Sequence, residues 1–270
     1  MGVTKISYEE SLELKKKFNA RHPESMHRIY HHSPQELSSV ERKMHFLINT
    51  QNGQDVDDYV VDDNSPLLKY FTDSDLHNKS MLLIGTGVGR EVITAQEMGA
   101  SVVKGTTLGQ RNKAYAKEIV GVDLEVCDMH AMPWPNEAFD LVCGFQVLEH
   151  SFMPVMFMLE CHRLLKTGGM VCFETPPSKT ISLDSWLHHV ICPTPRQMYY
   201  LFIKTGFKPV WFNGVDISNM NPDDEEVEIE GFDDTSIMVC MKAIRQDPRT
   251  YPRGDMLRYY YVLAGNDFSY

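Results

Sequence analysis

The chain has 270 residues, 43% of them hydrophobic, and a formal net charge of −11, which is enough apolar material for one globular domain with extensions. The excess of acidic residues argues against a nucleic-acid partner, because nucleic-acid-binding proteins neutralise phosphates with clustered Lys and Arg. No apolar run approaches the roughly 18 residues that span a bilayer, and the N-terminus lacks a signal-peptide pattern, so we expect a cytoplasmic protein with no membrane partner. The six cysteines form no C-x-x-C pair, which favours neither a disulfide framework nor a zinc site.

The first 80 residues are predicted to form helices that precede the core, as an N-terminal helical extension or lid. Residues 7–10 and 33–36 each contain a capping-box pattern, and the second has proline at the first helical position. Ser65-Pro66 predicts the start of a third helix. Five histidines lie between residues 22 and 45. Because metal ligands usually occur at fixed short spacing with carboxylates or thiolates, we interpret these histidines as surface residues and predict no metal site.

A strand, a glycine-rich turn and a helix follow one another near residue 80. Residues 81–84 are typical of a short buried strand, Gly85, Gly87 and Gly89 come next, and residues 90–98 carry apolar side chains at helical spacing. Such a turn lets the backbone come close to a ligand, with amide N–H groups of the helix N-terminus directed at it. A dinucleotide fingerprint has its third glycine one position later, where this chain has arginine, so the spacing does not favour a nicotinamide or flavin site.

From there to residue 173 the pattern alternates between strands and helices. Strands are predicted at residues 101–105, 124–127, 139–144 and 170–173, and helices at 110–120 and 157–165, the latter ended by Lys166-Thr167-Gly168-Gly169. This alternation predicts a parallel sheet with right-handed crossovers, and ligands of such sheets bind at the carboxyl ends of the strands. The residues expected around that crevice are Gly85, Thr107, Asp128 and Phe145.

The last part of the chain changes pattern. Residues 210–212 and 237–241 are predicted to form an antiparallel strand pair that closes the sheet. The insertion between them, residues 214–234, holds nine acidic and no basic residues, and we expect it to be exposed and readily cleaved by proteases. Residues 245–270 form a tail with five tyrosines and four arginines. Because Tyr and Arg are enriched in interfaces, we interpret this tail either as a contact for a homo-oligomer or protein partner, or as a strap on its own domain.

Five short motifs occur in order from the third predicted strand to the fifth. They are Cys127-Asp128-Met129, Met132-Pro133-Trp134-Pro135, Phe139-Asp140-Leu141-Val142, Val147-Leu148-Glu149-His150 and Leu164-Leu165-Lys166-Thr167-Gly168-Gly169. Their order resembles the class I S-adenosylmethionine-dependent methyltransferases of the small-molecule type, over residues 81–241. The resemblance implies an α/β, Rossmann-like fold with a seven-stranded, mostly parallel sheet, helices on both faces, an antiparallel last strand pair and an N-terminal helical extension. It places the methyltransferase domain at residues 81–244.

The resemblance also implies S-adenosyl-L-methionine as the cofactor. Gly85, Gly87 and Gly89 would line its methionine and ribose. Asp128 would accept a hydrogen bond from the adenine amino group, and the backbone N–H of Met129 would donate to a ring nitrogen, which fits the chemistry of a carboxylate and an amide.

This chain departs from the family at two acidic positions. The family usually has an acid where this chain has Leu83, and another at the end of the second strand, where this chain has Thr106 and Thr107. A threonine hydroxyl holds a ribose less tightly than a carboxylate does, and we expect Glu91 to replace part of the missing charge. The candidate cofactor-binding residues are Gly85, Thr86, Gly87, Gly89, Glu91, Thr106, Thr107, Asp128, Met129 and Phe145.

Two histidines are candidate catalytic residues. Methyl transfer from a sulfonium is an in-line displacement, in which a base helps only when the acceptor is a hydroxyl or a protonated amine. Histidine is the usual base near neutral pH, and His150 lies just past the fourth strand. The alternative for His150 is a helix-start residue bonded to the backbone. His189, with its neighbour His188, lies in a segment that resembles the family's substrate-covering region.

The acceptor can be narrowed by what the sequence lacks. Gly144-Phe145-Gln146 follows the fourth strand in place of the Pro-Pro-aromatic motif of amino-methylating DNA enzymes, and no Pro-Cys nucleophile for cytosine methylation is present. Our leading hypothesis is a methyltransferase that acts on a small-molecule or other non-nucleic-acid acceptor, with the acceptor atom left open. The alternative is a catalytically degenerate methyltransferase fold that serves as an interaction module.

Overall fold

The computed structural model describes residues 65–179, 189–220 and 230–247. The helices expected before residue 65, His188 and the tail from residue 248 onwards lie outside the described residues. The chain divides into two compact units, Met1–Asp128 and Met129–Tyr270, and each is described by itself. No helix within the described ranges is long and apolar enough to span a membrane.

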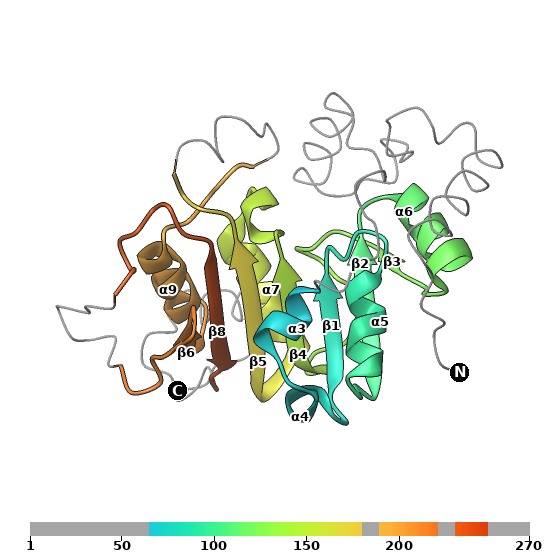
Figure 1. Ribbon diagram of the computed structural model, residues 1–270, viewed down its shortest axis with the longest axis horizontal. Helices are drawn as coiled ribbons and strands as arrows, with labels where there is room; N and C mark the ends of the chain where they lie inside the picture. Colours follow the sequence, from blue (N-terminus) through green and yellow to red (C-terminus); the bar gives the residue numbers. More distant parts are fainter. Residues whose placement is uncertain (1–64, 180–188, 221–229, 248–270) are drawn as a thin grey trace, which may run out of the picture. The chain divides into compact units, whose positions relative to one another are not determined.

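The first unit is built on three parallel strands in the order β3, β2, β1 (Figure 1). Its elements are α3 (Pro66–Tyr70), α4 (Asp73–Leu76), β1 (Ser80–Ile84), α5 (Arg90–Glu97), β2 (Val102–Thr107), α6 (Gln110–Tyr115), the π-helix η4 (Ala116–Val120) and β3 (Glu125–Val126). Ser65 caps α3 as predicted, because its hydroxyl accepts a hydrogen bond from the backbone N–H of Leu67 at 3.4 Å. The predicted strand after residue 80 is buried almost throughout, which fixes the glycine turn at its carboxyl end.

The second unit contains a five-stranded mixed sheet in the order β4, β5, β8, β6, β7. Its elements are β4 (Phe139–Phe145), the 3₁₀ helix η5 (Leu148–His150), α7 (Pro154–Leu164), β5 (Leu165–Thr175), α9 (Pro195–Lys204), β6 (Phe207–Phe212), β7 (Val215–Asp216) and β8 (Val239–Arg245). β4 and β5 are parallel, and β8 is antiparallel to both β5 and β6. The predicted α/β class and the antiparallel last pair are confirmed. The described residues form eight strands where seven were expected, because the short β7 is an addition.

A row of aromatic side chains fills the core of the second unit. Phe157 on α7 makes an edge contact with Phe173 on β5, which contacts Phe202 on α9, and Phe202 in turn contacts Phe207 on β6. All four side chains are fully buried. Each such pair contributes about 0.5–1.5 kcal/mol beyond the burial of its area. The row therefore ties both helices to the sheet whose strand ends carry the candidate site.

The Met132-Pro133-Trp134-Pro135 motif is held by α7. Arg163 donates hydrogen bonds to the carbonyls of Met132 and Trp134 at 3.1 and 2.8 Å and to the side chain of Asn136 at 3.0 Å. Glu160, which is buried, accepts from the backbone N–H of Met132 at 2.7 Å and pairs with Arg163 at 2.6 Å. This motif thus has a structural role within the unit.

The start of β5 differs from the sequence prediction. We expected Lys166 to Gly169 to form a turn before a strand that begins at Met170. The strand instead begins at Leu165 and contains a bulge, since Phe139 pairs with Leu165 whereas Leu141 pairs with Met170. Gly168, with φ of 79°, lies within this bulge. The strand therefore continues through the glycines instead of starting after them.

The acidic insertion is described only at its two ends, and residues 221–229 lie outside the described part. The carboxyl groups of Asp216, Asp233 and Asp234 are exposed, as the composition predicts. Ile217 and Phe232 are buried, however, at 3% and 1% exposure. Apolar residues placed singly among acids anchor the ends of the insertion, a feature that composition alone does not indicate.

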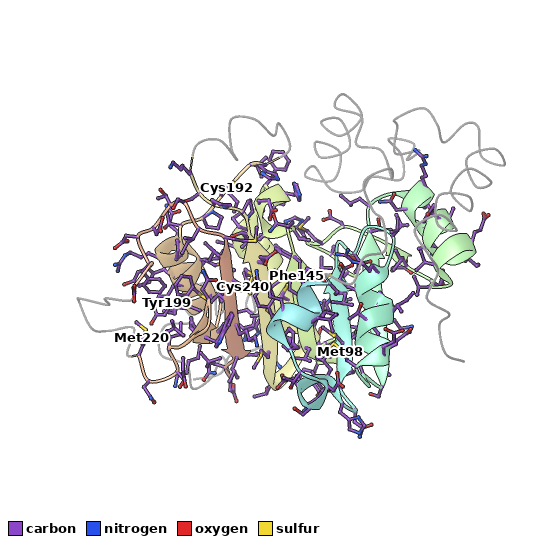
Figure 2. All side chains as sticks on the ribbon, in the orientation of Figure 1. Met98, Phe145, Cys192, Tyr199, Met220 and Cys240 are labelled. Carbon is purple, nitrogen blue, oxygen red and sulfur yellow. The ribbon has the colours of Figure 1, made fainter. Side chains whose placement is uncertain are left out.

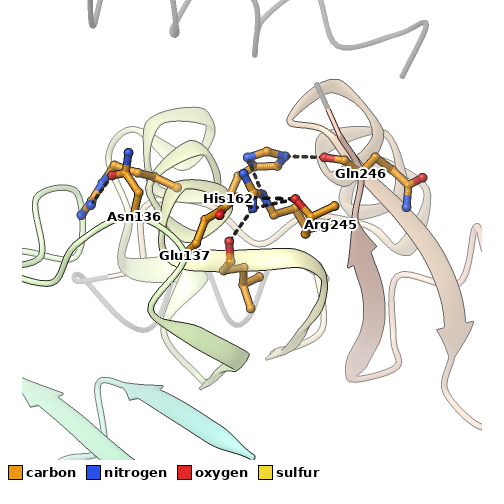
Figure 3. Close-up of polar contacts among 8 residues, drawn as sticks. Asn136, Glu137, His162, Arg245 and Gln246 are labelled. Carbon is orange, nitrogen blue, oxygen red and sulfur yellow. Dashed lines mark hydrogen bonds and ion pairs between the residues drawn. The ribbon is translucent and has the colours of Figure 1, made fainter. Parts of the chain in front are cut away.

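A buried polar cluster joins β8 to α7 and to the start of β5 (Figure 3). Arg245, 5% exposed, donates to the Leu165 carbonyl at 2.7 Å, to the Glu137 carboxylate at 2.6 Å and to Nδ1 of His162 at 3.3 Å. His162 Nε2 lies 3.1 Å from the carbonyl of Gln246. Arg245, which the sequence assigned to the tail, is therefore the last residue of β8 and part of the core.

Candidate active site

The glycine turn between β1 and α5 adopts a backbone that favours glycine. Gly85, Gly87 and Gly89 have φ angles of 67°, 56° and 91°, all in the left-handed region. A Cβ atom on Gly89 would lie 2.4 Å from Cγ2 of Val122. The absence of a side chain at Gly89 thus allows the N-terminus of α5 to approach the segment before β3.

We expect Gly89→Ala to lower the free energy of unfolding by about 2 kcal/mol, because backbone strain and the displacement of buried Val122 each cost about 1 kcal/mol or more. Gly121→Ala is the matched control, since Gly121 has φ of +84° and an added Cβ there meets nothing within 4 Å. That variant should lose only the strain, about 1 kcal/mol. Urea denaturation measures both, and equal losses would contradict the close approach.

Backbone and side-chain hydrogen bonds tie the turn to the end of β2. The N–H of Thr86 donates to the carbonyl of Thr106 at 2.9 Å, and the N–H of Gly85 donates to the Thr106 hydroxyl at 3.0 Å. Within the turn, the N–H of Gly89 donates to the carbonyl of Thr86 at 2.8 Å. Thr106 therefore positions the turn, a role that the sequence did not predict for it.

Three further predicted residues lie at the same end of the first unit. Thr107 ends β2, and its carbonyl accepts from the N–H of Cys127 at 3.3 Å, which places Asp128 beside the end of β2. Thr107 and Asp128 are 4% and 3% exposed. Thr86 is also buried, and its hydroxyl makes no hydrogen bond within the described part of the chain. A buried carboxylate, an unsatisfied hydroxyl and a cradle without side chains fit a polar ligand such as S-adenosylmethionine.

The two departures from the family are accommodated differently. Leu83 is 1% exposed within β1, where it belongs to the apolar core. Glu91 lies in the first turn of α5 and forms an ion pair with Arg90 at 3.2 Å. The carboxylate expected to replace the missing acid thus has a cationic neighbour of its own.

The other predicted residues belong to the second unit. Met129 is its first residue and is half-buried, and Phe145 is the half-buried last residue of β4 (Figure 2). Gln146 follows with φ of 57°, and its side-chain amide donates to the Glu174 carboxylate on β5 at 3.1 Å. This turn joins the carboxyl ends of β4 and β5 and leads into η5.

Glu149 belongs to the Val147-Leu148-Glu149-His150 motif, but it is not among the candidate site residues predicted from the sequence. Its side chain is 0% exposed, and neither carboxyl oxygen makes a hydrogen bond of ordinary geometry within the described residues. Burial raises the pKa of this carboxyl from 4.5 to about 8; its own backbone N–H offsets part of the rise and the nearby charge of Glu174 adds to it. An acid that directly follows valine and leucine in the sequence was the available signal, and such perturbed groups cluster at functional sites.

The two predicted catalytic histidines meet next to Glu149. The ring centroids of His150 and His189 are 5.0 Å apart, although the residues are separated by nearly forty positions in sequence. His150 ends η5, and its backbone N–H donates to the Val147 carbonyl at 3.0 Å. Both side chains are half-buried, so solvent or a small molecule reaches them.

The chain is similar in sequence and fold to known methyltransferases. Residues 82–173, from β1 to β5, match the family model described as a methyltransferase domain. A geranyl diphosphate methyltransferase, solved in complex with GPP and sinefungin, superposes with a TM-score of 0.51 at 19% identity, over 67% of this chain and 78% of that one. Over residues 82–173 the chain is therefore similar to methyltransferase domains, and it shares the fold of that solved methyltransferase.

Curated relatives share this methyltransferase domain at low identity. A 2-methyl-6-phytyl-1,4-hydroquinone methyltransferase from Oryza sativa subsp. japonica is 26% identical over 158 residues, which cover 53% of this chain and 45% of the rice protein. A ubiquinone biosynthesis O-methyltransferase from Roseobacter denitrificans is 28% identical over 150 residues, 48% of this chain and 60% of the relative. The chain thus spans about half the length of these relatives.

Proposed function

We propose that this protein is a methyltransferase that moves the methyl group of S-adenosylmethionine to a small-molecule acceptor. The observation that carries the proposal is the end of the first unit, where the glycine turn, the unsatisfied Thr86 hydroxyl and the buried Asp128 carboxylate lie together. Both curated relatives described above are named for small-molecule acceptors, one a hydroquinone and one an intermediate of ubiquinone biosynthesis, which supports an acceptor of that size.

The proposed mechanism divides the work between binding and proton removal. S-adenosylmethionine, when bound, would supply a methyl group on a sulfonium: an acceptor lone pair would form a bond to the methyl carbon as the carbon–sulfur bond breaks and the sulfur leaves as a neutral thioether. Asp128 would hold the adenine amino group and Thr107 a ribose hydroxyl, and the backbone of the glycine turn would line the methionine end. Alignment and exclusion of water provide most of the acceleration. A hydroxyl acceptor must also lose its proton, and the imidazole of His150 or His189 is suited to take it near neutral pH.

Titration calorimetry with S-adenosylmethionine tests the cofactor half of the proposal. We expect Asp128→Ala to weaken binding about tenfold or more, because a charge-assisted hydrogen bond to a buried amine contributes about 1.5–3 kcal/mol. Thr107→Asp should tighten binding, because it restores a bidentate acceptor for ribose. Asp123→Ala is the control: Asp123 belongs to the same unit, but its side chain is 73% exposed and 3.9 Å from Lys113.

Two results would overturn the assignment. One is a failure of the wild-type protein to saturate at millimolar S-adenosylmethionine, which would favour the interaction module instead. The other is an equal loss of affinity in Asp128→Ala and Asp123→Ala. A thermal shift gives an independent readout, since a ligand at a hundredfold excess over its Kd adds about 2.7 kcal/mol of stability.

A further inference from the structure

We propose that Glu149, His150 and His189 form a binding site for one divalent transition-metal ion. A carboxylate oxygen and one ring nitrogen from each histidine all lie within 4.8 Å of one another. A metal with bonds of about 2.0–2.2 Å holds its ligand atoms at most about 4.4 Å apart, so small rotations of the two imidazoles complete the geometry. The site lies entirely within the second unit and does not depend on the proposed function.

The surroundings of Glu149 favour a cation. Its carboxyl group is fully buried, and neither oxygen has a hydrogen-bond partner in the described part of the chain. A buried carboxyl group without a partner is unfavourable in either form, because the neutral acid lacks the hydrogen bonds that water would give it and the carboxylate lacks a compensating charge. Glu174, 6% exposed, is a second buried acid nearby and adds negative charge. A bound cation would give the Glu149 carboxylate a partner and would offset the negative charge of Glu174.

The backbone holds the ligands in place before any ion binds. The carbonyl of Glu149 accepts hydrogen bonds from the N–H groups of Val190 at 2.8 Å and Ile191 at 3.2 Å. These bonds clamp the segment that carries His189 against η5, which carries the other two ligands. On either side of the Glu149-His150 pair, Leu148 and Ser151 are fully buried, which fixes the direction of this turn. Such preorganisation distinguishes a built site from histidines that happen to be near each other.

The ligand types select the metal. Two imidazole nitrogens and one carboxylate oxygen suit Zn²⁺, Co²⁺, Mn²⁺ or Fe²⁺, whereas Mg²⁺ and Ca²⁺ prefer oxygen ligands alone. Three protein ligands leave at least one coordination position for water or for an oxygen of a bound molecule. A hydroxyl bound to the ion loses its proton more readily, so the ion would take over the role that the imidazole of His150 has in the proposed mechanism.

The test uses the full chain, freed of metal with a chelator, and Zn²⁺ as the titrant in calorimetry. We expect the wild type to bind one Zn²⁺ at this site with a higher affinity than the other histidines of the chain have for Zn²⁺. Glu149→Gln and His189→Ala should weaken this event about tenfold to hundredfold or more. His77→Ala, which removes an exposed histidine of the first unit, should leave it unchanged. Co²⁺ absorption gives a second readout, because loss of His189 should change the visible bands of the bound ion.

The outcomes separate this site from the cofactor site. Loss of tight Zn²⁺ binding in Glu149→Gln and His189→Ala, with S-adenosylmethionine affinity retained, supports the metal site. Zn²⁺ affinity and stoichiometry equal in the wild type and His189→Ala would overturn it, as would the absence of any tight event in the wild type. Circular dichroism confirms the fold of each variant, and the half-buried His189 provides the informative variant if the fully buried Glu149 does not tolerate substitution.

Discussion

Arg245→Ala should lower the free energy of unfolding by about 3–5 kcal/mol, the range typical of breaking a buried charged network. The substitution removes the donor for the buried carbonyl of Leu165 and for Nδ1 of His162, and leaves a cavity beside them. Glu137 contributes least to the loss, because its side chain is 54% exposed and water replaces its partner. Urea denaturation followed by circular dichroism measures the change.

Arg196→Ala is the control for this experiment. Arg196 binds Asp233 through two hydrogen bonds of 2.8 and 2.9 Å, but their side chains are 36% and 75% exposed. Removing such an exposed pair has little effect on stability, because water replaces the lost contacts and screens the charges. A loss in Arg245→Ala no greater than in Arg196→Ala would mean that the buried cluster does not hold the second unit together.

Acid should destabilise the wild-type protein through His162, by about 1.4 kcal/mol for each pH unit below 6.5 and about 2.7 kcal/mol at pH 4.5. Burial, and then the positive charge of Arg245, lower the pKa of His162 from 6.5 to about 3; Gln246 and Asp247 offset part of this. Because Nδ1 accepts from Arg245, Nε2 carries the proton toward the Gln246 carbonyl, and the ring is neutral in the folded state.

The direction of this pH dependence follows from the number of protons that the folded and the unfolded chain bind at His162. Below pH 6.5 the unfolded chain binds a proton at His162 that the folded chain binds only near pH 3, so stability is complete above 6.5 and falls as the pH decreases. The His162→Gln variant cannot titrate at this position, so the difference in stability between it and the wild type isolates the contribution of His162. Other titrating groups contribute equally to both proteins and cancel in that difference; one of them is Glu149, whose raised pKa makes stability change with pH in the opposite direction. Identical pH slopes for the wild type and His162→Gln between pH 6.5 and 4.5 would refute the neutral buried ring.

Local sequence patterns correctly predicted the elements that are determined by residues close together in the sequence. The glycine turn, the strands β1 and β4 and the cap at Ser65 depend on neighbouring residues, and each is found where expected. The contact between His150 and His189 was not predicted, although each was selected as a candidate from its own segment.

The features that sequence reasoning missed depend on contacts between distant segments. The burial of Glu149 requires residues 190 and 191 to fold back onto η5, which no local pattern encodes. The assignment of Arg245 to the core rather than the tail requires its pairing with Leu165, eighty positions earlier. The bulge in β5 reflects the register with β4, whereas the glycines alone indicate a turn.

The position of β8 constrains how the second unit forms during protein synthesis. The strand is the last of the eight to emerge from the ribosome, yet it lies between β5 and β6, and Met170 pairs with Ile244 across more than seventy positions. Until residue 245 has been made, β5 and β6 each present an open edge with unpaired backbone groups, and the β6–β7 hairpin has no strand to join. The nascent chain must therefore keep two open strand edges apart until β8 is inserted, and pairing between such distant segments slows folding and leaves the edges exposed to aggregation in the meantime.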